Sequence, residues 1–132
     1  MNYFKVNGKA YDVVVTGIEE TFSILYSENT GRTMAVGAEM VLDPLGTFFG
    51  HKVTVQKKAG CEVEYDTLYD YVSTPRAMGL KIEAAHNQTT IKYDAYISSG
   101  SRSLKRIGKD GTVHWGELQL NIVPMKAQVL PE

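Results

Sequence analysis

Alternation of apolar and polar side chains constrains this chain more than any other feature, because it recurs along most of the 132 residues. Successive side chains of a β-strand point to opposite faces, so a strand with one buried face has a period of two. The pattern predicts strands at residues 18–26, 34–42, 49–55, 80–84, 91–97 and from 113 onward. We therefore expect a mainly β protein.

Two glycine turns are typical of β-hairpins. Asn7-Gly8 readily takes the two positive φ angles of a type I′ turn, which predicts a hairpin between residues 3–6 and 11–15. Asp110-Gly111 predicts a hairpin between residues 104–107 and the last strand for the same reason.

Other breaks are signalled by turn-forming and polar residues. Asp43-Pro44-Leu45-Gly46 has the composition of a turn, and His86-Asn87 is a second candidate. Residues 27–33 form a polar break, and residues 98–103 are predicted to be a flexible polar loop.

The period changes once along the chain. Cys61, Tyr65, Leu68, Tyr69 and Val72 follow helical spacing, which places them on one stripe of an α-helix. Acidic residues lie in the early turns, where they interact favourably with the positive end of the helix dipole, and the helix is expected to end before Pro75. One amphipathic helix of about 12 residues is expected to pack on the sheet.

The last strand changes phase. Val113 and Trp115 are odd-numbered whereas Leu118 and Leu120 are even-numbered, so a β-bulge at Gly116-Glu117 keeps both halves facing the core. The length suits one domain, residues 1–132. The predicted fold is mainly β: a β-sandwich or partly closed barrel with one flanking α-helix and a protruding hairpin or loop.

Composition excludes several classes of function. Fourteen basic against fifteen acidic side chains give a net charge of −1, so there is no overall positive field to hold nucleic acid nonspecifically. A single cysteine, Cys61, excludes an internal disulfide and multi-thiolate zinc sites, and a reducing compartment is expected. No segment has the apolar length of a membrane span or the pattern of a secretory signal, so we expect no membrane insertion.

The histidines give no metal-binding pattern. His51, His86 and His114 include no pair at a ligand spacing, and His51 is in phase with neighbouring core positions. We therefore expect His51 to be a hydrogen-bonded core or interface histidine, and we expect no metal and no cofactor.

Two further groups of residues are candidates for a catalytic site. Cys61 near the start of the helix would have a lowered pKa if it were reactive, but its place on the apolar stripe favours a small buried side chain. Glu62, Asp66 and Asp70 form an acidic strip, for which a solvated helix face is the simpler interpretation. No catalytic residue is predicted, and an enzyme is the least favoured class.

The basic residues Arg102, Lys105, Arg106 and Lys109 are the strongest local cluster of charge. They are interpreted either as a solvated hairpin tip or as contacts to phosphates or to an acidic neighbouring subunit. Residues 34–42 also allow two interpretations. Their apolar face is buried either against another subunit, as an exposed arm, or in the core of the monomer.

The order of the elements resembles a known family. An N-terminal YFKVNG hairpin, the SENTGRT break and an alternating arm precede DPLGTFF and one helix that ends at VSTP. Two further hairpins, ending in LQLNIVPMKAQ, complete a pattern similar to the tail tube and distal tail protein superfamily of siphophages and prophages of Gram-positive bacteria. The resemblance implies a β-sandwich with one helix and a protruding hairpin or loop.

The resemblance also implies a function in assembly. Proteins of this group form rings, commonly hexameric, around the channel through which viral DNA leaves the capsid. The implied partners are further copies of the chain and other tail proteins (tail tube, tape measure, hub or baseplate), with transient passage of DNA. The implied location is the virion tail, after assembly in the cytoplasm of the bacterial host.

A head-to-tail ring needs two complementary surfaces on each subunit, and we expect an apolar arm to meet an open sheet edge or a sandwich face. The expected subunit contacts are Arg32, Met34, Val36, Met40, Phe48 and Phe49. The segment from Arg102 to Lys109, with Lys105 and Arg106, is expected to be a secondary interface or part of the lumen.

Two alternatives remain open at this point. The runner-up in the same class is a neck or tail-terminator ring at the other end of the tail. A different class of function is a small β-barrel module that holds an apolar ligand through Tyr93, Trp115 and Phe49.

Overall fold

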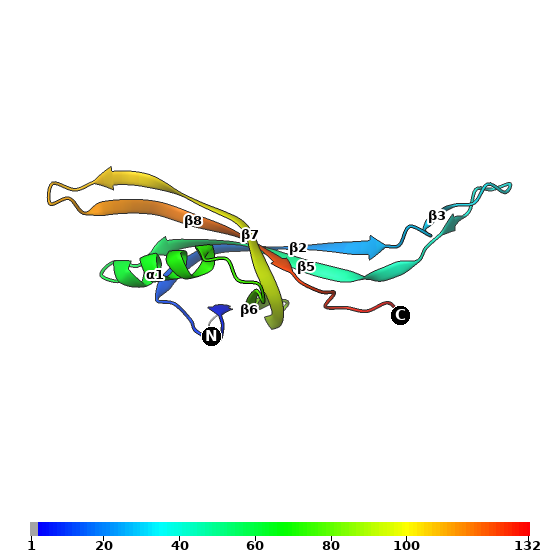
Figure 1. Cartoon of the computed structure of the whole chain (residues 1–132), viewed down its shortest axis with the longest axis horizontal. Helices are drawn as coiled ribbons and strands as arrows, with labels where there is room; N and C mark the ends of the chain where they lie inside the picture. Colours follow the sequence, from blue (N-terminus) through cyan, green and yellow to red (C-terminus); the bar gives the residue numbers. More distant parts are fainter. Residues whose placement is uncertain (1–2) are drawn as a thin grey trace.

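A computed structural model describes residues 3–132 of the chain. It contains eight strands and one helix, drawn in Figure 1. The elements are β1 (Phe4–Val6), β2 (Val13–Tyr26), β3 (Gly31–Arg32), β4 (Met40–Val41), β5 (Pro44–Lys57), α1 (Glu62–Ser73), β6 (Leu80–His86), β7 (Thr89–Ile107) and β8 (Val113–Pro124). The prediction of a mainly β protein with one helix is confirmed.

Six strands form one antiparallel sheet in the order β1-β6-β7-β8-β5-β2, and β3 pairs with β4 in a separate ribbon. The 19-residue strand β7 belongs to both halves of the sheet: its first half pairs with β6 and its second half with β8. His51 of β5 is hydrogen-bonded to Tyr93 of β7 and to Ala85 of β6, so the two halves lie face to face. The arrangement is consistent with a β-sandwich, and the strands described do not close into a barrel.

The core lies between these halves and under the helix. It contains Val6, Ile82 and Ala84 from one half and Val53, Val55, Leu118, Leu120 and Ile122 from the other. The helix contributes Tyr65, Leu68 and Val72, three members of the predicted apolar stripe. The Tyr65 hydroxyl donates a hydrogen bond to the Gly116 carbonyl oxygen over 2.7 Å, which fixes the helix against β8.

Two arms project from opposite ends of the elongated molecule (Figure 1). We define the first arm as residues 22–47, which comprise the ends of β2 and β5 and the β3–β4 ribbon. The second arm is residues 103–116, the tip of the β7–β8 hairpin. The protruding hairpin predicted from the sequence is thus present, once at each end.

The first predicted turn is correct, but the predicted hairpin is wrong. Asn7 and Gly8 both have positive φ, at 51° and 81°, and Val6 and Lys9 exchange two backbone hydrogen bonds of 3.0 Å. Val6 then pairs with Ile82 of β6, while residues 13–26 pair with β5 in the other half of the sheet. The local turn is dictated by Asn-Gly, whereas strand pairing is decided by burial of Val6 in the core.

Residues 34–42 do not form the predicted continuous strand, and the core-strand interpretation is wrong. Gly37 and Ala38 have φ of 95° and 44°, and the Ala38 N–H donates to the Ala35 carbonyl oxygen, so the chain turns at this point. Only Met40–Val41 is paired, with β3. These residues are the tip of the first arm.

Two other loop predictions are also wrong. Residues 98–103 lie inside β7, where residues 99–102 pair with residues 118–121 of β8 and Ser98 and Ser103 fall at irregularities of the register. Asp43-Pro44-Leu45-Gly46 does not reverse the chain, because β5 begins at Pro44, which pairs with Tyr26. Proline is tolerated at the first position of a strand, although it has no N–H to donate to the ladder of backbone hydrogen bonds.

The remaining elements agree with the sequence. Helix α1 spans 12 residues, and hairpins occur at residues 87–88 and 108–112. Arg102 pairs with Leu118 and Leu104 pairs with Trp115, so β8 has one extra residue at Gly116-Glu117, as the phase change predicts. No helix in residues 3–132 has the length and apolar character needed to cross a membrane.

Candidate functional site

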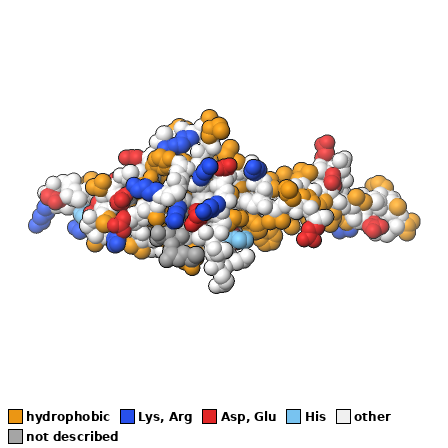
Figure 2. Space-filling view, turned by 90° about the horizontal axis from the view of Figure 1, so that it is seen from below, with side chains coloured by type: hydrophobic (Ala, Val, Ile, Leu, Met, Phe, Trp, Pro, Cys, Tyr) orange, Lys and Arg blue, Asp and Glu red, His pale blue; other side chains and the backbone are white. Residues whose placement is uncertain are grey.

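The first arm exposes apolar side chains along most of its length. Met34 and Val36 are fully exposed at the tip, and Phe22 at the base has 69% of its surface exposed. The exposed apolar residues of the arm are Phe22, Ile24, Leu25, Tyr26, Met34, Val36, Met40, Val41, Leu42 and Leu45. Figure 2 shows hydrophobic side chains over the corresponding end of the molecule. Monomeric soluble proteins rarely expose an apolar surface of this extent.

The backbone of the arm is held by polar contacts inside the arm. The Ser27 hydroxyl donates to the Asp43 carboxylate over 2.5 Å, and the Asp43 N–H donates to Thr30 Oγ1 over 2.8 Å. Farther out, Arg32 donates to the Ala38 carbonyl oxygen over 3.3 Å. These polar groups of the arm therefore form hydrogen bonds within the arm, while its exposed apolar side chains are available for contact with another surface.

The C-terminal segment supports the base of the arm. The Gln128 side chain accepts from the Phe49 N–H and donates to the Phe49 carbonyl oxygen, over 3.1 and 3.0 Å. Val129 bridges Thr47 of β5. Val129 and Leu130 remain exposed, so this segment extends the apolar surface of the arm.

The predicted subunit contacts divide into two groups. Arg32, Met34, Val36 and Met40 lie together on the first arm and are exposed. Phe48 and Phe49 lie at its base on opposite faces of β5. Phe48 lines an open groove on the outer sheet face with Leu25, Tyr96 and Val123, whereas Phe49 makes an edge contact with the His86 ring at a centroid distance of 4.9 Å.

The predicted basic cluster is only partly a free surface. Lys105, Arg106 and Lys109 are exposed on the second arm, beside the exposed apolar residues Leu104, Ile107 and Val113. Arg102, in contrast, lies at the base of this arm, and its side chain is only 14% exposed.

Arg102 is engaged within its own chain. Its guanidinium carbon lies 3.6 Å from the centre of the Tyr69 ring and 4.2 Å from the centre of the Trp115 ring. Its Nη1 donates to Asp66 over 3.2 Å. These contacts join α1 to the second arm, and the lumen or secondary-interface role expected for Arg102 stays a prediction.

The histidine prediction is correct, since His51 is buried and hydrogen-bonded. Its Nε2 lies 3.2 Å from the Ala85 carbonyl oxygen and 3.1 Å from the Glu20 carboxylate. Nε2 therefore carries the proton, and in the neutral ring Nδ1 accepts from the Tyr93 hydroxyl over 2.5 Å. His86 also contacts the Glu20 carboxylate, over 2.7 Å, so this carboxylate joins two histidines.

Burial shifts two pKa values in this cluster. Burial lowers the pKa of His51 below its usual value of 6.5, against the opposing effect of the Ala85 carbonyl oxygen and the Glu20 carboxylate. Burial also raises the pKa of the Tyr93 hydroxyl well above its usual range. The cluster thus holds a neutral histidine and a neutral tyrosine between the two halves of the sheet.

Cys61 is not the buried side chain that the sequence predicts, whereas the acidic strip is solvated as expected. Cys61 is half-buried just before α1, and its thiol donates to the Asp12 carboxylate over 3.1 Å. That hydrogen bond raises the pKa of the thiol, which is opposite to the activation that a reactive cysteine requires. Glu62, Asp66 and Asp70 are exposed on the solvated face of the helix, as predicted.

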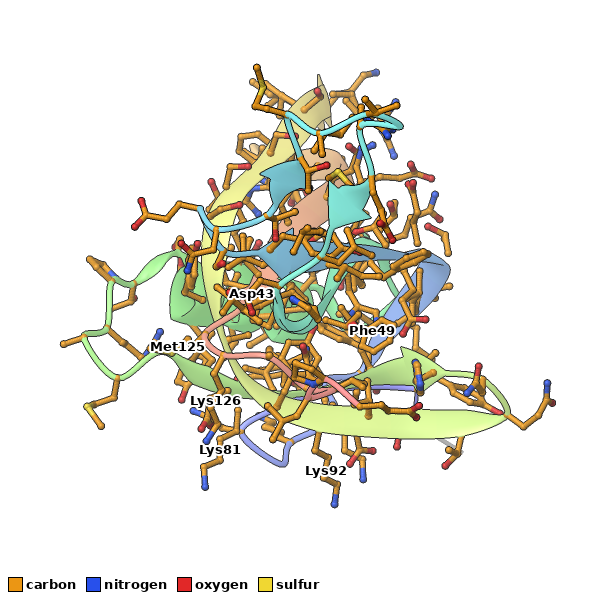
Figure 3. The ribbon with its side chains drawn as sticks, turned by 90° about the vertical axis from the view of Figure 1, so that its right-hand side faces the viewer. Asp43, Phe49, Lys81, Lys92, Met125 and Lys126 are labelled. Carbon is orange, nitrogen blue, oxygen red and sulfur yellow. The ribbon has the colours of Figure 1, made fainter. Side chains whose placement is uncertain are left out.

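The three residues proposed for an apolar ligand do not meet in one cavity. Tyr93 packs on His51 and Phe49 packs on His86, two histidines that are joined by Glu20, whereas Trp115 packs on Arg102 at the base of the second arm. A hollow of about 770 Å³ lies over β6 and β7 beside residues 126–128, and its lining includes Glu83, Asp94 and four lysines. Three of them, Lys81, Lys92 and Lys126, are labelled in Figure 3. Residues 3–132 contain no group of three or more potential metal-ligating side chains.

Sequence reasoning missed the apolar side chains of the second arm. The interface or lumen role expected for residues 102–109 rests on their basic side chains. The apolar side chains of Leu104, Ile107 and Val113 carry no such expectation, and they are all exposed. It also missed the uneven distribution of charge: residues 22–47 contain no lysine, and residues 103–116 contain three of the basic side chains. That signal was available in the sequence.

The two arms are therefore the surfaces of this protein that most need a partner. No model of a known protein family matches the chain, and no curated protein matches it in sequence.

Proposed function

We propose that this protein is a non-enzymatic structural component of a phage or phage-derived tail. Copies of the chain would form a ring, hexameric in the family that the sequence resembles, which connects the tail tube to the distal tail and surrounds the DNA channel. The observation that carries the proposal is the first arm, a preformed projection whose tip residues Met34 and Val36 are fully exposed.

Burial of that arm supplies a driving force for assembly. Association through a specific interface typically removes about 800 Å² from each partner, and the apolar part contributes about 25 cal/mol per Å². An arm that already holds its own polar groups, through Ser27 and Asp43, loses little conformational entropy on docking. Such an arm suits a permanent subunit contact.

A ring around DNA also needs a weak interaction with phosphates. The net charge of −1 favours transit, because a strongly cationic lumen would retain DNA. The proposed partners are further copies of the chain and other tail proteins, namely the tail tube, tape measure, and hub or baseplate. The proposed location is the virion tail, after assembly in the bacterial cytoplasm.

The absence of catalysis is part of the proposal. Both ring nitrogens of His51 are engaged by protein atoms, and the Cys61 thiol is hydrogen-bonded to a carboxylate that raises its pKa. These groups therefore support structural roles and do not resemble an activated base or nucleophile.

Electron microscopy of the purified full-length protein over a series of concentrations tests the proposal. The expected result is closed rings of uniform size with a central channel. Particles that remain single 14.6 kDa subunits at every concentration, with no ring in any field, would overturn it.

A further inference from the structure

The two arms carry opposite charge. The first arm, residues 22–47, contains three carboxylates (Glu28, Glu39 and Asp43) and one guanidinium (Arg32), so its net charge is −2. The second arm, residues 103–116, contains three basic side chains (Lys105, Arg106 and Lys109) and one carboxylate (Asp110), so its net charge is +2. The arms lie at opposite ends of the molecule, so the chain is electrically polar along its length (Figure 1 and Figure 2).

The charges at the arms are available to a partner. Glu28 and Glu39 are exposed and form no ion pair within residues 3–132, and the same holds for Lys105, Arg106 and Lys109. Arg32 and Asp110, the charges of opposite sign in the two arms, are also exposed, and each makes a hydrogen bond to the backbone of its own arm. Asp43 is bonded to Ser27, and Arg102 at the base of the second arm is paired with Asp66.

The apolar side chains of the arms are arranged in the same complementary way. The first arm presents Met34, Val36 and Leu42 close in sequence to Glu28 and Glu39. The second arm presents Leu104, Ile107 and Val113 beside its basic residues. Each arm thus has an apolar surface flanked by charge, and the sign of the charge is opposite in the two.

We propose that the first arm of one copy docks on the second arm of the next copy. The apolar surfaces meet, and Glu28 and Glu39 pair with Lys105, Arg106 or Lys109 across the contact. The inference rests on the proposed function, because it names the receiving surface for the arm that drives assembly, and it specifies a head-to-tail contact between identical chains.

Charge decides between this contact and a symmetric one. A two-fold pairing of two first arms would bring together two surfaces that each have a net charge of −2, and like charges in a desolvated interface are unfavourable. The head-to-tail contact brings together −2 and +2. It uses two different surfaces and closes into a ring when the rotation between copies permits.

A charge-swap experiment tests this contact on the full-length protein. One variant carries Glu28→Lys with Glu39→Lys, a second carries Lys105→Glu with Arg106→Glu, and sedimentation equilibrium measures self-association. Each variant alone has two arms of the same sign, so we expect association at least about 10-fold weaker than that of the wild type, since close interfacial charge pairs couple by more than 1.4 kcal/mol. An equimolar mixture of the two variants restores opposite charges at each contact, and we expect it to recover association.

The control matched to Lys105→Glu with Arg106→Glu is Lys81→Glu with Lys126→Glu, which makes the same change of net charge at the hollow over β6 and is expected to leave association unchanged. Circular dichroism checks that each variant is folded. If the wild type associates and both arm variants associate equally well, the arm-to-arm contact is wrong while the ring proposal stands. If the variants weaken association but the mixture does not restore it, the two arms do not meet each other. A wild type that does not associate overturns both proposals.

Discussion

The guanidinium of Arg102 lies against the ring of Tyr69, with its central carbon 3.6 Å from the ring centre. Tyr69 belongs to α1 and Arg102 to β7, where the second arm begins. Trp115 lies on β8, the other strand of the hairpin, and the centre of its ring is 4.2 Å from the same guanidinium carbon. A single cation between aromatic rings therefore connects the helix to the base of the projecting hairpin.

Replacing Arg102 with Ala is expected to lower the free energy of unfolding by about 2 kcal/mol, since a partly desolvated cation–π contact contributes about 1–2 kcal/mol and the packing of the side chain is also lost. The ion pair to Asp66 adds little, because Asp66 is 58% exposed. Urea denaturation followed by the fluorescence of Trp115, the single tryptophan, measures the change.

Arg106→Ala, at an exposed position of the same strand, is the control and is expected to change stability by less than about 0.5 kcal/mol. Equal losses in the two variants would show that the aromatic contacts of Arg102 contribute nothing.

The buried histidine predicts a dependence of stability on pH. Burial lowers the pKa of His51 in the folded state below the usual 6.5, so the unfolded state takes up a proton more readily. The contribution of His51 is therefore fully present above about pH 6.5 and is lost as the pH falls through the lowered folded pKa. The groups that face His51 are Tyr93, Glu20, the Ala85 carbonyl oxygen and, through Glu20, His86.

His51→Gln is expected to flatten the loss of stability between about pH 7 and pH 5. Urea denaturation at a series of pH values gives the slope, which is compared with that of His114→Gln, a histidine on the second arm. Identical slopes for the wild type and His51→Gln would contradict a lowered pKa at His51.

Gly79 is expected to be the least replaceable of the turn glycines. Its φ is +70°, and a Cβ at this position would lie 2.4 Å from the Ala95 carbonyl oxygen and 2.7 Å from the Met125 sulfur. Gly79→Ala is expected to cost about 3 kcal/mol, because both the positive φ and the contact with backbone are unfavourable.

Gly111→Ala distinguishes the cost of a positive φ from the cost of the close contact, since Gly111 has φ of +84° with open space around it. Its expected cost is about 1 kcal/mol, from backbone conformation alone. If thermal denaturation shows equal losses for both variants, the close approach of Ala95 has no energetic effect.

Much of the local structure could be predicted from the sequence because its causes are local. The phase change of alternation at Gly116 predicted the bulge, and the apolar stripe through Tyr65 and Leu68 predicted the helix. The partner of β1 could not be predicted in this way, because pairing of Val6 with Ile82 depends on burial between segments far apart in sequence.

The errors at residues 98–103 and 34–42 have the same origin. Polar residues such as Ser98 and Ser101 resemble a loop in isolation, but β8 supplies a paired backbone and makes them a strand. Conversely, Met34 and Val36 alternate like a strand, but Gly37 turns the chain and no strand within residues 3–132 pairs with them. The sequence predicts contact residues on the first arm, where Met34 and Val36 are exposed, whereas the exposure of Ile107 on the second arm could be seen only in the structure.

The tip of the first arm is expected to be dispensable for folding. Residues 35–40 are all exposed, so their deletion should change the free energy of unfolding of the monomer by less than about 1 kcal/mol while ring formation is abolished. Circular dichroism and urea denaturation measure the first effect, and electron microscopy measures the second. Loss of the folded state on deletion would instead place this segment among the residues that stabilise the monomer.

The most direct test of self-association through the first arm is the mass in solution of the full-length protein beside that of a variant with Met34→Ser and Val36→Ser. Light scattering is expected to give a defined multiple of 14.6 kDa for the wild type and a shift toward 14.6 kDa for the variant, since two fully exposed apolar side chains are lost from the contact. The same mass for both proteins, whether single or multiple, would contradict the account.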